Sequence, residues 1–409
     1  MGAGVYGALS GHAERVARWS GIALGFSIPI SVALDNALLA LFVAGWVASG
    51  AWRAKWQAIR SNPVALAALA LLALLAVGTL YGERDPGDGA RYLVKYSDLL
   101  LVALLAFIFR DAQARAHALL ALVAGLALVL CLSYLIHFGI IPHGKLSGVD
   151  QAAPIVFKHS LTHNVLMALG AYLFAQYAGQ AASREVRACW IALAVLAAVN
   201  VLFMVPGRTG QLILVVLAVY GGYVWKGWRG ATVAGAAMAV LLLIPGPMQQ
   251  RFEQGFQERS AWEAGDHGRP SSIGDRLEFY RASLAIVREH PWVGVGTGGF
   301  PRAYARHIEG TALAPSRNPH NEFLHLAVQL GAIGLAAFLW LLATQWRLSG
   351  RLASAPETHL ARALVLTIVT GCMFNSLLLD HTEGLLYAWL TGVLYGGVKS
   401  GGNGVMTDG

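Results

Sequence analysis

Long apolar runs separated by short polar segments extend along almost the whole chain of 409 residues. A helix needs about 20 predominantly apolar residues to cross the hydrocarbon core of a bilayer, and counting such runs predicts about twelve spans. The spans are 17–33, 35–50, 63–81, 92–109, 116–138, 159–179, 187–204, 209–225, 230–245, 320–345, 359–379 and 382–398. The first two could form one long helix, because only a short polar break at 31–36 separates them. The pattern therefore predicts an all-α, polytopic membrane protein.

A long loop divides the predicted membrane part of the chain. Nine spans fall in residues 1–245, the loop covers 246–319, and the last three spans with a short tail fall in 320–409. Within the loop, 272–289 has the pattern of an amphipathic helix that begins with a capping-box-like sequence and ends before a proline. Its apolar stripe predicts a helix that lies on the membrane surface with this side toward the lipid. The stripe consists of Ile273, Leu277, Tyr280, Leu284 and Val287.

Composition supports the membrane assignment and explains the net charge. Charged residues make up 13% of the chain, whereas soluble proteins contain about 25%. The net charge of +8 follows from topology and requires no nucleic-acid partner, because cations concentrate in the short loops on the cytoplasmic side of membrane proteins. With a cytoplasmic N-terminus, every such loop here is basic, and the long loop lies outside the cytoplasm. We expect no cleavable signal peptide, because the N-terminal region lacks that pattern.

The loop is rich in arginine and contains no lysine. Arginine presents a planar fork that binds phosphate oxygens bidentately, which a lysine ammonium group cannot do. Acidic residues nearly balance the arginines, so the loop is a patterned surface and not a polycation. A site for a phosphorylated lipid is therefore predicted beside the membrane, although each arginine by itself could equally be a surface residue. The arginines are Arg251, Arg259, Arg269, Arg276, Arg281, Arg288, Arg302, Arg306 and Arg317.

The loop ends at Pro319, and His320 and Asn321 follow directly before the tenth span. Histidine titrates near neutral pH and can accept a proton from a hydroxyl group. We therefore expect His320 to act as a general base; the alternative is an interfacial histidine that hydrogen-bonds to the backbone. Glu322 is a competing base, and His325, more than one turn deeper, is expected to be structural.

Other cations are predicted on the same side of the membrane. Arg208 lies in a very short turn between two spans, where a charge needs a partner such as a lipid pyrophosphate. Lys158 and His159 precede the sixth span. His163 follows His159 by four residues, but no carboxylate or cysteine follows at ligand spacing, so no metal site is predicted. The three cysteines lie in apolar runs and are expected to pack there.

Three further features have simpler explanations. Lys95 and Asp98, one turn apart in the fourth span, predict an intramembrane ion pair. Residues 294–299 contain a formal Gly-x-Gly-x-x-Gly, but no βαβ unit surrounds it, so a tight turn that approaches a ligand or a helix is favoured over a dinucleotide site. Residues 380–383 could contact acceptor hydroxyls or cap the last span.

Four elements in this order resemble the bacterial O-antigen ligase/polymerase superfamily. They are Gly-Arg-Thr-Gly at 207–210, Asp-Arg-Leu at 275–277 with Arg281, HPWVGVGTGGF at 290–300, and PHNEFLHLAVQLGAIGL at 319–335. The similarity covers about 195–345, and a twelve-span layout with one large late loop extends it to most of the chain. The motifs are typical of the superfamily and not of one branch.

The resemblance implies a GT-C-like glycosyltransferase of the Gram-negative inner membrane that takes a glycan from undecaprenyl pyrophosphate on the periplasmic face. In the ligase branch the acceptor is a sugar hydroxyl of lipid A–core, and neither a nucleotide cofactor nor a metal is implied. We hypothesise that His320 deprotonates this hydroxyl, that Asn321 orients His320 or a sugar, and that the product is inverted. Cationic side chains would hold the pyrophosphate: Arg208, Arg276 and either Arg281 or Arg288, with Lys158 and His159 as possible additions.

Three alternatives remain open. A polysaccharide polymerase would lengthen the lipid-linked glycan, and a protein O-oligosaccharyltransferase would modify serine or threonine. The typical form of the residues around His320 favours the ligase, because polymerases diverge there. A transporter of lipid-linked sugar belongs to another class; it predicts charges deep in several spans and two similar halves, neither of which the sequence shows.

Overall fold

The computed structural model describes residues 2–82, 85, 87–146, 153–243, 257, 260, 272–311 and 313–398. All regular structure in these residues is helical, which confirms the predicted all-α class. The helices are α1 (Gly2–Ser27), α2 (Val32–Ala48), α3 (Trp52–Arg60), α4 (Pro63–Gly78), α5 (Asp88–Tyr96), α6 (Leu99–Ile108), α7 (Ala112–His137), α8 (Ser160–Gln180), α9 (Arg184–Val199), α10 (Arg208–Leu242), α12 (Ser272–Glu289), α13 (Phe300–His307), α14 (Glu322–Leu348), α15 (Ala355–Cys372) and α16 (His381–Tyr395). The predicted loop helix thus has the bounds that the sequence pattern indicates.

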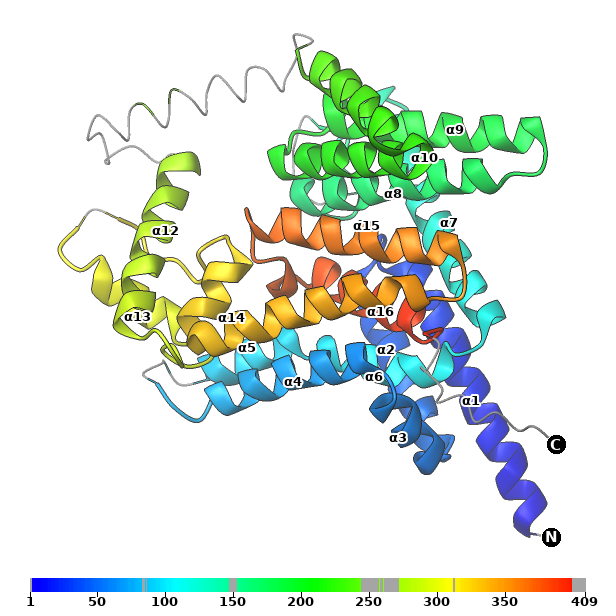
Figure 1. The fold of residues 1–409 in the computed structure, drawn as a ribbon, viewed down its shortest axis with the longest axis horizontal. Coiled ribbons are helices and arrows are strands. Elements are labelled where there is room, and N and C mark those ends of the chain that lie inside the picture. The colour runs from blue at the N-terminus through cyan, green and yellow to red at the C-terminus, as the bar shows by residue number, and fades with distance from the viewer. Residues whose placement is uncertain are drawn as a thin grey trace.

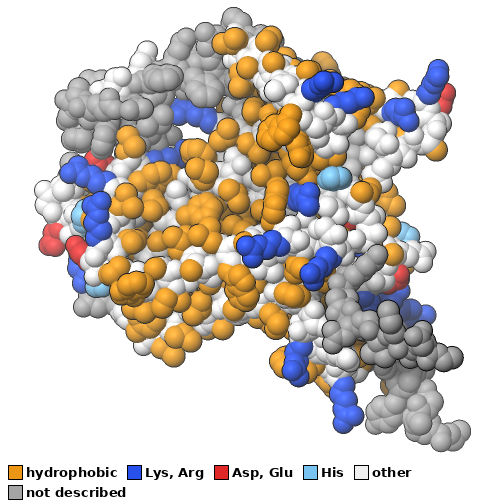
Figure 2. Space-filling view, viewed as in Figure 1, with side chains coloured by type: hydrophobic (Ala, Val, Ile, Leu, Met, Phe, Trp, Pro, Cys, Tyr) orange, Lys and Arg blue, Asp and Glu red, His pale blue; other side chains and the backbone are white. Residues whose placement is uncertain are grey.

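Most of the long helices lie roughly side by side, and α12 and α13 lie together at one end of the bundle (Figure 1). Hydrophobic side chains cover much of the face in Figure 2. In the described residues four helices are long and apolar enough to cross a membrane, or up to five if the sharply bent pair α2–α3 is one span. The predicted count of about twelve therefore stays a prediction. Residues 246–256, 258–259 and 261–271, with Arg251, Arg259 and Arg269, lie outside the described residues.

The helix α10 contains a hairpin. Lys226 and Gly227 have non-helical backbone angles, and Gly227 has a φ of 59°. The two arms pack closely, because a Cβ added to Gly230 would lie 2.0 Å from the carbonyl oxygen of Gly222. This break coincides with the polar interruption between the predicted spans 209–225 and 230–245.

Side-chain hydrogen bonds divide the helix ends into two groups, one at each end of the bundle. At one end, the buried Arg115 donates to Glu357 over 2.8 Å, and Asn62 donates to the carbonyl of Tyr395. These residues belong to connections that the predicted topology places in the cytoplasm. The connections predicted to lie outside meet at the other end, as the contacts of His320 and Lys158 below show. The helix ends therefore group as the predicted topology requires.

Lys95 and Asp98 do not form the predicted ion pair. The helix breaks between α5 and α6, and the two side chains lie in different surroundings. Lys95 lies near Asp380, while Asp98 lies near Asp35 and His381. The prediction assumed an unbroken helix, in which side chains three residues apart are neighbours.

The glycine-rich segment 291–299 docks its backbone into a break in α14. Gly331 has a φ of 63°, and the helical hydrogen bonds around it are replaced. Val295 and Gly296 donate to the carbonyls of Val328 and Gln329, while Ala332 donates to Pro291. The backbone groups that the break releases are thus paired again, as a buried segment requires. The turn therefore serves helix packing, which is one of the two roles that the sequence predicted for it.

We expect Gly296→Ala to destabilise the protein strongly. Gly296 has a φ of +86°, and an added Cβ would lie 2.3 Å from the carbonyl oxygen of Tyr81. Gly310 has a similar φ of +79° but open space around it, so Gly310→Ala isolates the backbone strain of about 1–2 kcal/mol. Thermal unfolding in detergent should show a clearly larger loss for Gly296→Ala, and equal losses would contradict the proposed clash.

The buried face of α12 differs from the predicted stripe. Leu284, a member of that stripe, is 46% exposed. The buried positions are instead Ala282, Ser283 and Ile286, and Ala282 and Ile286 share a small hydrophobic core with Tyr304 of α13. The face of α12 that packs against protein is thus not the predicted stripe, and the contact of the stripe with lipid stays a prediction.

Candidate functional site

His320 lies in a strained turn immediately before α14. Its φ of 51° is in the left-handed region, which non-glycine residues rarely adopt and which is often found at functional sites. Asn321 follows as the N-cap of α14, and its side-chain oxygen accepts from the backbone N–H of Leu324 over 3.0 Å. The backbone N–H of His320 donates to the side chain of Asn318. The side chains of Asn318 and Asn321 thus hold the turn through which the chain enters the helix.

A relay of polar groups orients the His320 ring. Asn375 Nδ2 donates to Asp380 Oδ2 over 3.1 Å, so its Oδ1 is turned toward His320, 3.0 Å from Nδ1. An amide oxygen only accepts hydrogen bonds, so Nδ1 carries the ring proton. The lone pair of Nε2 is then available to accept a proton, which is the state that a general base requires.

The helix α12 closes one side of the His320 turn. The Tyr280 hydroxyl lies 3.3 Å from the carbonyl oxygen of His320 and 2.8 Å from that of Met373. The ring of Phe279 lies 5.8 Å from the His320 ring, and Asn321 Nδ2 donates to Met373. The loop helix, the start of α14 and the residues after α15 therefore meet at His320.

Glu322, the competing base in the sequence, has a structural position. It is fully buried; Tyr96 donates to its Oε1 over 2.6 Å and the Leu378 N–H donates to its Oε2. With both oxygens occupied, it ties the first turn of α14 to the segment before α16. His325 is also fully buried, between the rings of Tyr92 and Phe300. Its structural position agrees with the prediction.

Asp380 is the charged group behind His320. Burial raises the pKa of its carboxyl group, while Lys95, His320, the hydrogen bond from Asn375 and His159 counteract the rise. A partly buried carboxylate can stabilise a positive charge that develops on the imidazole. Asp380 thus holds Asn375 in place and is suited to stabilise a protonated His320.

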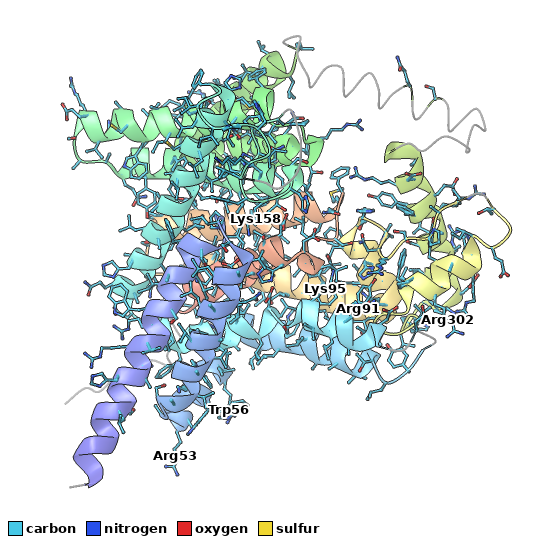
Figure 3. The ribbon with its side chains drawn as sticks, turned by 180° about the vertical axis from the view of Figure 1, so that it is seen from behind. Arg53, Trp56, Arg91, Lys95, Lys158 and Arg302 are labelled. Carbon is cyan, nitrogen blue, oxygen red and sulfur yellow. The ribbon has the colours of Figure 1, made fainter. Side chains whose placement is uncertain are left out.

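Lys158 lies in a buried polar cluster that continues from Asp380. It is 8% exposed, and its ammonium group has no hydrogen-bond partner among the described residues. Burial lowers the pKa of Lys158, while Asp35 and Glu383 counteract the shift. Ser27 donates to Asp35 over 2.5 Å, and His381 lies 3.5 Å from the same carboxylate. Figure 3 labels Lys158 and Lys95 near the middle of the molecule seen from behind; Lys95 is exposed, whereas the buried, unpaired ammonium group of Lys158 favours an anionic or polar ligand.

Arg208 lies at the same end of the bundle. It begins α10 directly after Gly207, and an added Cβ on Gly207 would lie 2.3 Å from the side-chain nitrogen of Asn164 in α8. Asn164 also donates to Val205, so the turn before Arg208 is fixed against the first turns of α8. His159, just before α8, is exposed, whereas His163 is buried and pairs with Asn200 over 3.0 Å. In the described residues these histidines belong to no cluster that could hold a metal ion.

The three arginines of α12 fall on different faces. Arg276 is one turn before Tyr280, on the side of α12 that contacts the His320 turn. Burial raises the pKa of the Tyr280 hydroxyl, and the positive charge of Arg276 counteracts this rise. Arg281 and Arg288, seven residues apart, instead line a separate pocket between α12 and α13. The structure thus brings Arg276 to the His320 side and places Arg281 and Arg288 elsewhere. Whether any of them binds pyrophosphate stays a prediction.

Asn375 was not predicted as a site residue from the sequence. It is a single amide within an apolar stretch, and no local pattern connects it with His320, 55 residues earlier. A polar pair, Asn375 and Ser376, inside an apolar run was the only available signal, since buried polar residues in membrane helices are often functional.

The comparisons with known proteins agree with the motifs. No curated protein matches the chain. Residues 192–339 match the model of the family described as O-antigen ligase, and this match contains Arg208, Arg276 and His320. The resemblance indicated by the sequence motifs is therefore confirmed over residues 192–339, which are similar to the O-antigen ligase family.

Proposed function

We propose that the protein is an O-antigen ligase, which transfers a glycan from undecaprenyl pyrophosphate to a sugar hydroxyl of lipid A–core on the periplasmic face of the inner membrane. The observation that carries this proposal is the relay from Asp380 through Asn375 to His320, because it leaves Nε2 free to take a proton from an acceptor. The match of residues 192–339 to the O-antigen ligase family supports a glycosyltransferase of the ligase/polymerase type.

The reaction is a single displacement. His320 Nε2 takes the proton of the acceptor hydroxyl, the acceptor oxygen forms a bond to the anomeric carbon, and the bond from that carbon to the pyrophosphate oxygen breaks. Undecaprenyl pyrophosphate leaves with the bonding electrons, and the anomeric centre inverts. Positioning and charge neutralisation supply most of the acceleration, because pyrophosphate is already a good leaving group.

Cations around the His320 turn are proposed to hold the leaving group. Arg208 would bind the pyrophosphate from the start of α10 and Arg276 from α12, on the side of Tyr280. Lys158 has a buried ammonium group without a hydrogen-bond partner among the described residues, and His159 lies beside it at the start of α8. The side chain of Asn321 caps α14 and donates to Met373, so its proposed role is to position His320.

The test is a transfer assay with the purified full-length chain in nanodiscs. Undecaprenyl-pyrophosphate-linked glycan and lipid A–core are supplied without nucleotide, and the lipopolysaccharide is separated on a gel. A lipid A–core band shifted upward supports the ligase. Lengthening of the lipid-linked glycan assigns a polymerase instead, and transfer to a serine or threonine peptide assigns a protein glycosyltransferase. Movement of the lipid-linked glycan between leaflets without transfer would support the transporter.

Replacing Arg208 with glutamine should impair use of the donor much more than use of the acceptor. A charge-assisted hydrogen bond contributes about 1.5–3 kcal/mol, which corresponds to an increase of roughly 10- to 100-fold in the KM for the lipid-linked glycan. Arg302→Gln is the matched control, because Arg302 is exposed on α13 (Figure 3). Equal changes in both KM values would contradict the proposed role of Arg208.

A further inference from the structure

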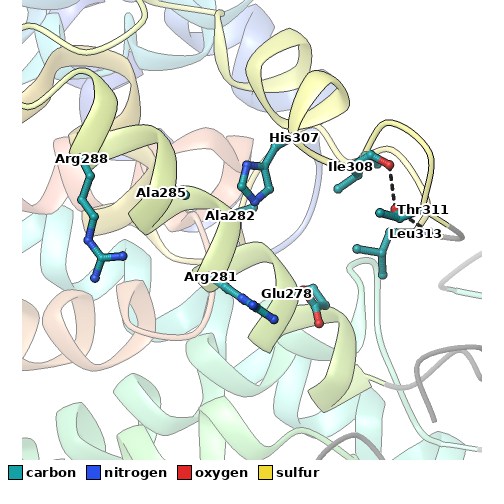
Figure 4. Close-up of a pocket in the computed structure, with 9 residues that line it drawn as sticks. All are labelled: Glu278, Arg281, Ala282, Ala285, Arg288, His307, Ile308, Thr311 and Leu313. Atoms are coloured by element: carbon teal, nitrogen blue, oxygen red, sulfur yellow. Dashed lines mark hydrogen bonds between the residues drawn. The ribbon is translucent and has the colours of Figure 1, made fainter. Parts of the chain in front are cut away.

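A pocket on the side of α12 that faces away from the His320 turn is lined by cations. It has a volume of about 410 Å³ and lies between α12 and the segment formed by α13 and the residues after it. Arg281, Arg288 and His307 line it, and Glu278 is its one acidic lining residue among those described. Figure 4 shows Arg281 and Arg288 projecting from α12 and His307 extending from α13.

The pocket is distinct from the His320 site. At 100° per residue, Arg281 and Arg288 lie about 80–100° around α12 from Tyr280, whose hydroxyl contacts the carbonyl of His320. The small core of Ala282 and Ile286 with Tyr304 fixes α12 against α13. This packing sets the width of the pocket and keeps the two arginines away from the turn that His320 occupies.

The two guanidinium groups are available for a ligand. Neither Arg281 nor Arg288 forms an ion pair with any residue that the structure describes. Their spacing of seven residues, two helical turns, puts both groups on one face of α12. Glu278 already has an interaction of its own. Two arginines against one carboxylate leave the pocket positive, and paired arginines favour phosphate or carboxylate oxygens.

The shape of the pocket favours a sugar that carries the anion. Its volume lies at the low end of the range of about 300–1,000 Å³ for small-ligand pockets. Ala282, Ala285 and Leu313 provide apolar walls for the C–H face of a sugar ring, and the Thr311 hydroxyl, which donates to the carbonyl of Ile308, lies at the rim. A bare phosphate ion would leave these walls uncovered.

We propose that this pocket binds a phosphate-bearing sugar of the acceptor, adjacent to the sugar whose hydroxyl reacts at His320. The identity of the acceptor rests on the proposed function; the anion site itself rests on Arg281, Arg288 and the pocket. An α-helix with its side chains is about 10–12 Å across, so one oligosaccharide that passes over α12 can place one sugar in this pocket and another at His320. The pocket would thereby select phosphorylated acceptors and hold them in register.

The experiment measures binding without requiring transfer. The full chain in nanodiscs is titrated with soluble phosphorylated core oligosaccharide, with the same oligosaccharide after phosphatase treatment, and with inorganic phosphate. We expect Arg281→Gln and Arg288→Gln each to raise the Kd for the phosphorylated oligosaccharide at least about tenfold, as loss of a charge-assisted bond implies. Both variants should leave the weak binding of the dephosphorylated oligosaccharide unchanged, and Arg302→Gln should change neither.

Kinetics distinguish the possible outcomes. In the transfer assay the two variants should raise the KM for the acceptor and leave kcat and the KM for the donor unchanged. A raised donor KM would overturn the proposal and return these arginines to the pyrophosphate site that the sequence predicts. The proposal would also be overturned if Arg281→Gln and Arg288→Gln bound the phosphorylated oligosaccharide with the same Kd as Arg302→Gln. It would be overturned as well if the unaltered protein bound inorganic phosphate as tightly as the phosphorylated oligosaccharide. Phosphate-dependent binding without any transfer by the unaltered protein would support the anion site and refute the proposed function.

Discussion

Replacing His320 with alanine is expected to reduce glycan transfer by about 10²–10⁴-fold, the usual contribution of a positioned general base. Because Asn375 accepts a hydrogen bond from Nδ1, Nε2 is the ring atom that would receive the acceptor proton in the proposed mechanism. KM values for both substrates should change little, because the side chain acts on the reacting hydroxyl in the transition state. Initial rates of lipid A–core modification measure the effect.

His290→Ala is the matched control for His320. His290 follows the end of α12 and is exposed, so its loss should leave the rate unchanged. Wild-type rates in His320→Ala at neutral pH would remove His320 from the chemistry. Thermal unfolding of the same variants separates a chemical effect from a loss of structure in the turn. Alanine at position 320 keeps the φ of 51°, so the substitution does not relieve the backbone strain.

Asp380→Asn is expected to lower activity by about 10- to 100-fold, less than the loss of the base itself, and to raise stability at the same time. The amide keeps an acceptor for Asn375 but no longer supplies the charge that stabilises a protonated His320. Stability should rise because burial raises the pKa of Asp380, which means that the folded state disfavours its charged form. Transfer assays and thermal unfolding of the same preparations measure the two effects.

The size of the stability gain from Asp380→Asn depends on pH. Above its raised pKa, Asp380 is charged in the folded wild-type protein and destabilises it. As pH falls through that value the folded state takes up a proton and the destabilisation disappears. The melting temperature of Asp380→Asn should therefore exceed that of wild type most at pH 8, and the difference should shrink at acidic pH. Glu309→Gln, an exposed carboxyl at the end of α13, should show no such trend; an Asp380→Asn protein less stable than wild type at pH 8 would contradict the account.

The fold was predictable where the signal is local. Apolar runs predict helices, and the bounds of α12 and the break in α10 both follow from polar, glycine and proline residues next to those runs. The break in α14 was not predictable, because Gly331 lies inside an apolar stretch and its cause is the docking of residues 291–296, which are distant in sequence. The face of α12 that packs against α13 was not predictable for a related reason, since the periodicity of an apolar stripe does not say which neighbouring helix covers the other positions.

The candidate site shows the same division. His320 and Asn321 were found because they follow a proline at the start of an apolar run, and Asn321 proved to be the helix cap. Glu322 could not be excluded as a base from the sequence, because only the structure shows Tyr96 and Leu378 occupying its carboxylate. Asn375 was missed entirely, since its importance arises from a tertiary contact. The sequence alone could not show that Arg281 and Arg288 line one pocket, because that depends on the position of α13.

The hydrogen bonds around the site also have a consequence for the order of events during synthesis. Asn375 orients the ring of His320. In the polar cluster around Lys158, Ser27 donates to Asp35, and His381 lies beside the same carboxylate. Trp389 of α16 donates to the carbonyl of Gly21 in α1. The contacts of His381 and Trp389 cannot form until α16 has emerged from the ribosome and packed against α1 and α2. A nascent chain whose earlier helices are already inserted therefore lacks these contacts. The polar cluster around Lys158 is completed only in the last step of assembly.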